Sequence, residues 1–237
     1  VLAAVLCACS AAPKDVLPNK AAQPTEAPTQ QAQTTQAAPT EQPTPEPDPV
    51  QQLLEEMTME QKVGQLFLVR PDSLDLSQTQ DQINDAKADG VTELTDAMRQ
   101  TLAEYPVGGV VIFGKNLESP QQITQFLDDL QQASDTPLFT AIDEEGGLVA
   151  RLANNAAFDL PQYESAAAVG TSGNPEDARA MGRTIGGYLK KYGFNLDFAP
   201  VADVNTNPDN PVIGTRAFSS EPQTAADLVG GACAGFA

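Results

Sequence analysis

The sequence LFTAIDEEGGLVAR, residues 138–151, carries the strongest structural signal in the chain. Its first five residues form an apolar run of the kind that becomes a buried strand. Three carboxylates, Asp143, Glu144 and Glu145, follow at once, and two glycines then allow the backbone to turn. Acidic side chains at the end of a buried strand are typical of the active-site rim of an α/β protein. We therefore interpret this run as a candidate site, the alternative being a solvated acidic loop.

Three more apolar runs predict strands, at residues 65–69, 108–113 and 195–199. Segments with helical spacing of apolar residues separate the four runs, and several begin with a capping residue followed by proline. Alternating strands and helices predict a parallel sheet, as either a doubly wound fold or a (β/α)8 barrel. No GxGxxG or P-loop follows any strand, and polar residues follow three strands, as in a barrel.

We therefore predict an α/β fold in residues 50–237, a partial (β/α)8 TIM barrel of about the first four βα units. Residues 71–93 are polar and weakly patterned, which indicates an insertion with some helix.

Composition limits the possible functions of the 237 residues. The 32 acidic and 13 basic side chains give a net charge of −19, so the chain should repel nucleic acid and anionic lipid surfaces. There is no histidine, which excludes a Ser-His-Asp triad or a histidine metal site within these residues. We expect no metal and no organic cofactor.

The first fifty residues resemble an export signal and a tether. Residues 1–9 read as the remnant of a signal peptide ending in a lipobox, in which Ala8 precedes Cys9. We predict that Cys9 carries a lipid; an ordinary cleavage site in a secreted protein is the alternative. Residues 10–49, rich in Pro, Gln, Thr and Ala, cannot bury enough apolar surface to fold, so we predict a disordered linker. The expected location is extracytoplasmic, as a membrane-anchored lipoprotein at a bacterial cell surface.

Five motifs in order resemble the N-terminal catalytic domain of glycoside hydrolase family 3. They are MTMEQKVGQL (57–66), GGVVIF (108–113), IDEEGGLVAR (142–151), NLDFAPVADV (195–204) and IGTRAF (213–218). The Asp-Glu-Glu-Gly-Gly form with its following arginine is similar to the β-N-acetylhexosaminidase branch of that family.

The resemblance implies a (β/α)8 barrel and retaining hydrolysis of terminal β-linked N-acetylglucosamine from glycans or cell-wall fragments. Asp143 matches the aspartate that binds hydroxyls of the terminal sugar, and Arg151 and Arg216 match arginines of the same pocket. Charge-assisted hydrogen bonds suit both roles. For Asp203 the resemblance favours a structural role, such as bonding Arg216.

The histidine-bearing segment of the family would follow Ala237, and with it the acid/base and the nucleophile. Retaining hydrolysis needs both groups, so the chain by itself is expected to lack the catalytic pair and to be inactive. Two alternatives remain open: a β-glucosidase-type glycosidase, and a non-catalytic, lipid-anchored glycan-binding protein.

Overall fold

The computed structural model describes residues 48–237. The predicted signal remnant, Cys9 and nearly all of the predicted linker lie outside the described residues. The linker was predicted to extend through residue 49, but helix α1 begins at Pro49, with the Asp48 carboxylate accepting a hydrogen bond from the amide of Val50.

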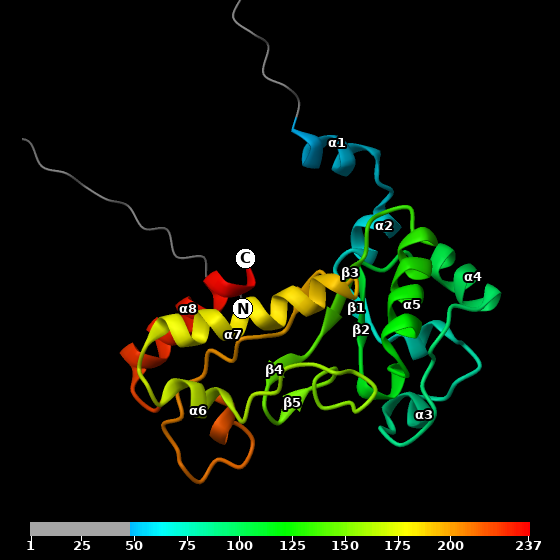
Figure 1. The fold of residues 1–237 in the computed structure, drawn as a ribbon. Helices are drawn as coiled ribbons and strands as arrows, with labels where there is room; N and C mark the ends of the chain where they lie inside the picture. The colour runs from blue at the N-terminus through cyan, green and yellow to red at the C-terminus, as the bar shows by residue number, and fades with distance from the viewer. Residues whose placement is uncertain (1–47) are drawn as a thin grey trace, which may run out of the picture. The chain divides into compact units, whose positions relative to one another are not determined.

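Helices and strands alternate through this region (Figure 1). The helices are α1 (Pro49–Glu56), α2 (Met59–Gly64), α3 (Gln80–Asn84), α4 (Asp96–Glu104), α5 (Pro120–Gln132), α6 (Ala166–Gly170), α7 (Pro175–Lys191) and α8 (Pro222–Phe236). The strands are β1 (Leu68–Val69), β2 (Gly109–Ile112), β3 (Phe139–Ile142), β4 (Glu144–Gly146), β5 (Val149–Ala150) and β6 (Leu196–Asp197). Three 3-10 turns are η1 (Pro71–Leu74), η2 (Gly114–Asn116) and η3 (Gly214–Arg216).

Four strands form one parallel sheet in the order β1-β2-β3-β6. Each strand pairs with its predecessor among these four, and Ile142 of β3 lies opposite Asp197 of β6. A doubly wound sheet reverses its strand order at a switch point, whereas the wall of a (β/α)8 barrel does not. The order therefore confirms the predicted partial barrel. Different elements lie at the two ends of the strands: α3 and the β4–β5 hairpin lie beyond the carboxyl ends, and α2 lies at the opposite end (Figure 1).

Capping residues fix the starts of the helices as the sequence predicts. Thr58 and Gln61 make reciprocal capping-box hydrogen bonds at α2. Ser119 caps α5 and Asn174 caps α7, each followed by proline at the first helical position. Because these interactions are local, the sequence alone is sufficient to place them.

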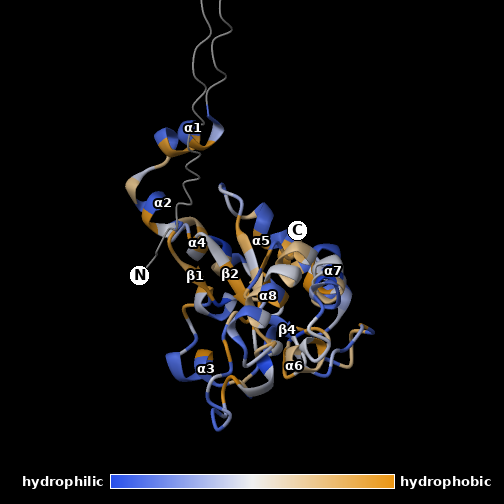
Figure 2. Ribbon diagram, turned by 90° about the vertical axis from the view of Figure 1, so that its left-hand side faces the viewer, coloured by the Kyte–Doolittle hydropathy of each residue, from blue (hydrophilic) through white to orange (hydrophobic). Residues whose placement is uncertain are grey.

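The core lies between the sheet and the helices that cover it. Figure 2 shows β1 and β2 in the hydrophobic colour. The fully buried side chains at the centre of the core are Met98, Leu102, Val110, Ile112, Ile123, Phe126, Leu127, Leu130, Ile142 and Ile185. Helix α1 contributes nothing to this core: none of its residues is buried, and Val50, Leu53 and Leu54 are exposed.

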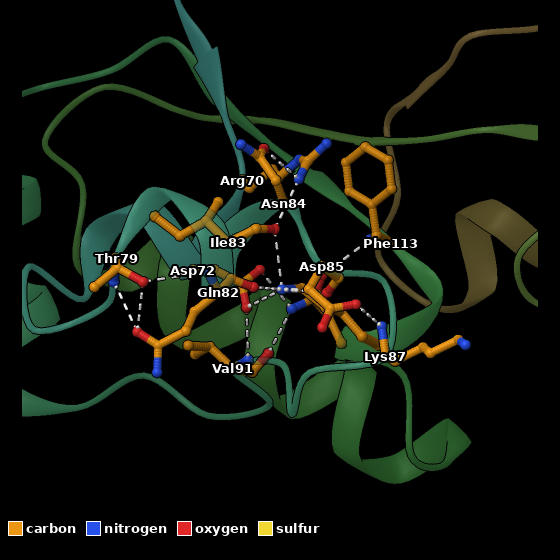
Figure 3. Close-up of polar contacts among 12 residues, drawn as sticks. Arg70, Asp72, Thr79, Gln82, Ile83, Asn84, Asp85, Lys87, Val91 and Phe113 are labelled. Atoms are coloured by element: carbon orange, nitrogen blue, oxygen red, sulfur yellow. Dashed lines mark hydrogen bonds and ion pairs between the residues drawn. The ribbon is translucent and has the colours of Figure 1, made fainter.

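The insertion after β1 is held by a buried polar group that we call the Asp72–Asn116 clasp. Asp72 is fully buried and accepts hydrogen bonds from the Val91 amide (3.1 Å) and from Asn116 Nδ2 (3.0 Å). Lys115 Nζ lies 3.3 Å from Asp72 and donates to the carbonyl oxygens of Gln82 and Ile83, each at 3.1 Å. Figure 3 shows the polar contacts of this region, with Asp72, Gln82, Ile83 and Val91 among the labelled residues. Residues 75–92, which we call the arm, are thereby attached to the end of β2.

Within residues 48–237, no helix combines the length and the apolar composition that crossing a membrane requires.

Candidate functional site

The candidate site is built around the β4–β5 hairpin, which the sequence showed only as a turn. Gly146 and Gly147 have φ angles of 81° and 75°, in the left-handed region that favours glycine. A Cβ on Gly146 would also lie 2.4 Å from Met181 Cε, so the hairpin packs closely on α7. The hairpin turns the chain back so that residue 151 returns to the carboxyl end of β3.

Asp143, the first residue after β3, forms an ion pair with Arg151. Arg151 Nη2 lies 2.9 Å from Asp143 Oδ2, and the two side chains are 32% and 25% exposed. The Arg151 guanidinium carbon lies 5.7 Å from the centroid of the Phe113 ring, within the range of a cation–π contact. The pair is therefore fixed in position and partly exposed.

Glu144 points into the protein and is fully buried. Its two carboxylate oxygens accept hydrogen bonds from the amides of Leu152 (2.8 Å) and Ala153 (2.9 Å) and from the Tyr188 hydroxyl (2.8 Å). Burial raises the pKa of Tyr188, and the neighbouring Glu144 charge raises it further, so the hydroxyl remains a donor. Glu144 thus joins β4, the residues after β5, and α7, and has no access to a ligand.

Glu145 binds Arg216 through two parallel hydrogen bonds. Arg216 Nε donates to Oε2 at 2.8 Å and Nη2 donates to Oε1 at 2.7 Å. The hydrogen bonds to Glu145 raise the pKa of Arg216. Asp203, the predicted structural partner of Arg216, is instead exposed and makes no hydrogen bond or ion pair within residues 48–237. Arg216 therefore pairs with Glu145, which accepts two hydrogen bonds from it, and not with Asp203, which accepts none.

Asp197, at the end of β6, is a site residue to which sequence reasoning gave no role. Its Oδ1 accepts a hydrogen bond from the Glu144 amide at 2.9 Å. Its Oδ2 is buried and has no hydrogen-bond partner among the described residues. Burial raises the pKa of Asp197 to about 7, against the opposing effect of the Glu144 amide, and the nearby Glu144, Asp143 and Glu145 carboxylates raise it further. Its position at a strand end opposite Ile142 was the available signal.

A pocket of about 390 Å³ opens beside the Asp143–Arg151 pair. Arg70, Phe113 and Arg151 line it together with part of the arm, including residues 83–86. Arg70 donates to the Ile83 carbonyl at 2.8 Å, and its guanidinium carbon lies 4.5 Å from the Phe113 ring centroid. Several polar side chains line this pocket, among them Arg70, Asn84 and Arg151. Hydrogen-bond donors and acceptors of this kind suit a ligand with many hydroxyl groups.

Of the three predicted binding residues, the structure brings Asp143 and Arg151 into contact and attaches Arg216 to Glu145, two residues from Asp143. Within residues 48–237, no group of three or more His, Cys, Asp or Glu side chains is arranged to hold a metal ion.

Known proteins are similar to this chain in sequence and in fold. A beta-hexosaminidase A from Pseudoalteromonas piscicida is 36% identical over 143 residues, covering 58% of this chain and 24% of that protein. A glycoside hydrolase family 3 beta-N-acetylglucosaminidase from Paenibacillus sp. FPU-7 superposes with a TM-score of 0.63 at 33% identity, over 76% of this chain and 31% of that one. NagZ from Neisseria gonorrhoeae, solved with N-trifluoroacetyl-D-glucosamine, gives a TM-score of 0.56 at 25% identity, over 62% of this chain and 44% of that one.

The chain spans less than half the length of each of these proteins. The sequence profile described as "Glycosyl hydrolase family 3 N terminal domain" matches residues 58–236, which is nearly all of the folded region. The barrel wall, the hairpin and the match together establish that the chain belongs to glycosyl hydrolase family 3, to its N-terminal domain.

Proposed function

We propose that this chain is part of a retaining β-N-acetylhexosaminidase and supplies one side of the pocket for the terminal N-acetylglucosamine. The observation that carries the proposal is the partly exposed Asp143–Arg151 ion pair at the carboxyl end of β3. The relatives support it, because those named above are beta-hexosaminidases or beta-N-acetylglucosaminidases, and one is bound to an N-acylated glucosamine analogue.

The proposal gives different parts of the sugar chemistry to different side chains. A carboxylate such as Asp143 accepts hydrogen bonds from two sugar hydroxyls, and hydrogen bonds to a charged acceptor are stronger than neutral ones. Arg151 holds that carboxylate in place and keeps donors for the sugar or its acyl group. Arg216 is 24% exposed; it binds Glu145 through Nε and Nη2 and donates through Nη1 to the Val212 carbonyl oxygen at 3.2 Å, and its remaining N–H groups are the donors offered to the sugar.

The acid/base and the nucleophile are proposed to come from a part of the protein outside this chain. The three carboxylates that the hairpin brings together already have other partners: Asp143 binds Arg151, Glu144 is buried, and Glu145 binds Arg216. The complete protein would then act by double displacement through a glycosyl-enzyme.

The test compares full-length wild type with Asp143→Asn, using aryl β-N-acetylglucosaminide and aryl β-glucoside as substrates. We expect cleavage of the N-acetylglucosaminide, and a loss of kcat/KM on the order of 100-fold in the variant, because one charge-assisted contact to the sugar is lost. Asp209→Asn, an exposed residue of the loop after β6, is the matched control and should retain activity.

Three results would contradict the proposal in different ways. A preference for the glucoside would indicate β-glucosidase specificity. Binding of N-acetylglucosamine without release of the aryl group would indicate a non-catalytic glycan-binding protein. Full activity of Asp143→Asn would show that the Asp143 carboxylate does not bind the sugar.

We also propose that Cys9 carries a lipid and that the protein faces outward from a bacterial membrane. The lipobox-like residues 6–9 and the Pro-rich residues after them support this. Expression in a bacterium fed a labelled fatty acid should label wild type and Cys7→Ala, but not Cys9→Ala. Label retained by Cys9→Ala, or no label on any form, would contradict the anchor.

A further inference from the structure

The Asp197 carboxyl group has two unequal oxygens. Oδ1 accepts the Glu144 amide at 2.9 Å, whereas Oδ2 is buried without a hydrogen-bond partner among the described residues. The contacted amide belongs to the peptide bond that joins Asp143 to Glu144. Asp197 therefore acts on the backbone at the point where the open Asp143 side chain and the buried Glu144 side chain diverge.

Three carboxylates, Asp143, Glu144 and Glu145, act on Asp197. Each of the three already has a cationic partner or several hydrogen-bond donors. Asp143 is paired with Arg151, Glu145 with Arg216, and Glu144 accepts three hydrogen bonds, one of them from Tyr188 on α7. No Lys or Arg of residues 48–237 lies within ion-pair distance of Asp197; Lys190 lines the same surface hollow but makes no such contact.

A negative charge on Asp197 would thus be the least stabilised charge in the cluster. When carboxyl groups in one site differ in donors and burial, the proton stays on the group with the fewest donors. Asp143 and Asp197 each have one donor, but that of Asp143 is the charged Arg151, whereas that of Asp197 is a neutral backbone amide, so the proton stays on Asp197.

We propose that Asp197 is a positioning residue that is protonated on the acid side of neutrality and, as a neutral carboxyl group, fixes the Asp143–Glu144 peptide so that Asp143 faces the sugar. This role rests on the proposed function of Asp143. Loss of the proton strengthens the hydrogen bond from the Glu144 amide, because a carboxylate is the better acceptor, but it places a fourth negative charge beside Asp143, Glu144 and Glu145. Repulsion between the Asp197 and Asp143 charges then disturbs the orientation of Asp143. Sugar binding therefore declines as the pH rises through the titration of Asp197.

The proton itself is tested independently of any sugar. Infrared difference spectra between full-length wild type and Asp197→Asn are recorded at about pH 6 and about pH 8, on either side of the Asp197 pKa of about 7. We expect the carbonyl band of one protonated carboxyl group in wild type at the lower pH, and its loss at the higher pH. Absence of the band at the lower pH overturns the proposal, whatever the protein binds.

The positioning role is tested by the pH dependence of N-acetylglucosamine affinity in full-length protein. Wild type should lose affinity on the order of 5-fold between the two pH values, the size of a modest coupling between sites. Asp197→Asn keeps the acceptor for the Glu144 amide but cannot ionise, so its affinity should stay near the wild-type low-pH value throughout. Asp197→Leu lacks the acceptor for the Glu144 amide and should bind N-acetylglucosamine weakly at both pH values.

These outcomes separate the two proposals. If Asp197→Asn shows the wild-type pH dependence, or Asp197→Leu binds as well as Asp197→Asn, the positioning role is overturned. If no form binds N-acetylglucosamine although the infrared band is present, the proposed function fails and the positioning role fails with it, while the proton on Asp197 stands. Asp209→Asn should follow wild type in every measurement.

Discussion

At the scale of single residues, three consecutive carboxylates have three different environments. Asp143 stays partly open beside Arg151, Glu144 is fully buried, and Glu145 is buried against Arg216. The sequence singled out Asp143 as the sugar ligand and allowed Glu144 and Glu145 a supporting role behind it. The structure shows that only the first of them is open to a ligand.

Glu144→Gln should lower the free energy of unfolding by about 3 kcal/mol, because an amide nitrogen would then face a backbone N–H that Glu144 now accepts. Urea denaturation of the full-length protein measures the change. The matched control is Glu176→Gln, whose side chain is 71% exposed and pairs loosely with Arg179 at 3.7 Å; it should change stability by less than about 0.5 kcal/mol. Equal effects of the two substitutions would show that the Glu144 hydrogen bonds do not stabilise the fold.

At the scale of elements, α7 and α8 approach closely because glycines line their contact. A Cβ on Gly231 of α8 would lie 2.3 Å from the carbonyl oxygen of Pro175 in α7. A Cβ on Gly182 of α7 would lie 2.3 Å from the carbonyl oxygen of Ala232 in α8. The preceding residue, Gly230, has nothing within 4 Å of its Cβ position. Two adjacent glycines therefore have opposite roles.

Gly230→Ala should stabilise the protein by roughly 0.5–1 kcal/mol, since alanine is the better helix former. Gly231→Ala should destabilise it by about 1–3 kcal/mol, because the new methyl group forces the helices apart. Thermal melts of the two variants, side by side, check both signs. A stabilising Gly231→Ala would mean that α8 can move away from α7 without loss.

The Asp72–Asn116 clasp predicts where the arm is weakest. Asn116→Ala removes hydrogen bonds to Asp72 and to the Val91 carbonyl, and leaves the buried Asp72 with one partner fewer. Amide exchange in residues 75–92 should become on the order of 10-fold faster, while exchange in α5 stays unchanged. Asn84→Ala, which removes only a 3.3 Å contact with Arg70, is the control. Uniform acceleration across the whole chain would show instead that the clasp stabilises the fold globally.

At the scale of the whole molecule, β1 and β6 are the outer strands of the described sheet. Large apolar side chains beside them are exposed: Leu66 is 79% exposed, Phe67 56% and Phe198 47%. Unpaired strand edges and exposed apolar groups favour association.

Residues 50–237, expressed alone, should therefore associate or fold loosely, with a mass by light scattering that rises with concentration. Replacing Phe67 and Phe198 with serine should shift the mass toward that of a monomer. A concentration-independent monomer with a sharp cooperative melt would contradict the expectation.

Much of this molecule could be predicted from the sequence, for physical reasons that differ by feature. The strand at 138–142 and the caps at Ser119 and Asn174 follow from local patterns, so they were predicted correctly. The β4–β5 hairpin was missed because its strands have only three and two residues and β4 begins with two glutamates. The Asp72–Asn116 clasp and the Glu145–Arg216 pair were missed because they join residues 44 and 71 positions apart, a separation that no local pattern encodes.

The three environments at residues 143–145 have a consequence for how this segment can vary. A substitution changes one side chain and leaves its neighbours in place. Insertion or deletion of a single residue between β3 and Gly146 would move each following residue by one position, so another side chain would stand where Glu144 now accepts the Leu152 and Ala153 amides and where Glu145 now binds Arg216. Related sequences that keep this site should therefore differ here in residue identity and never in loop length.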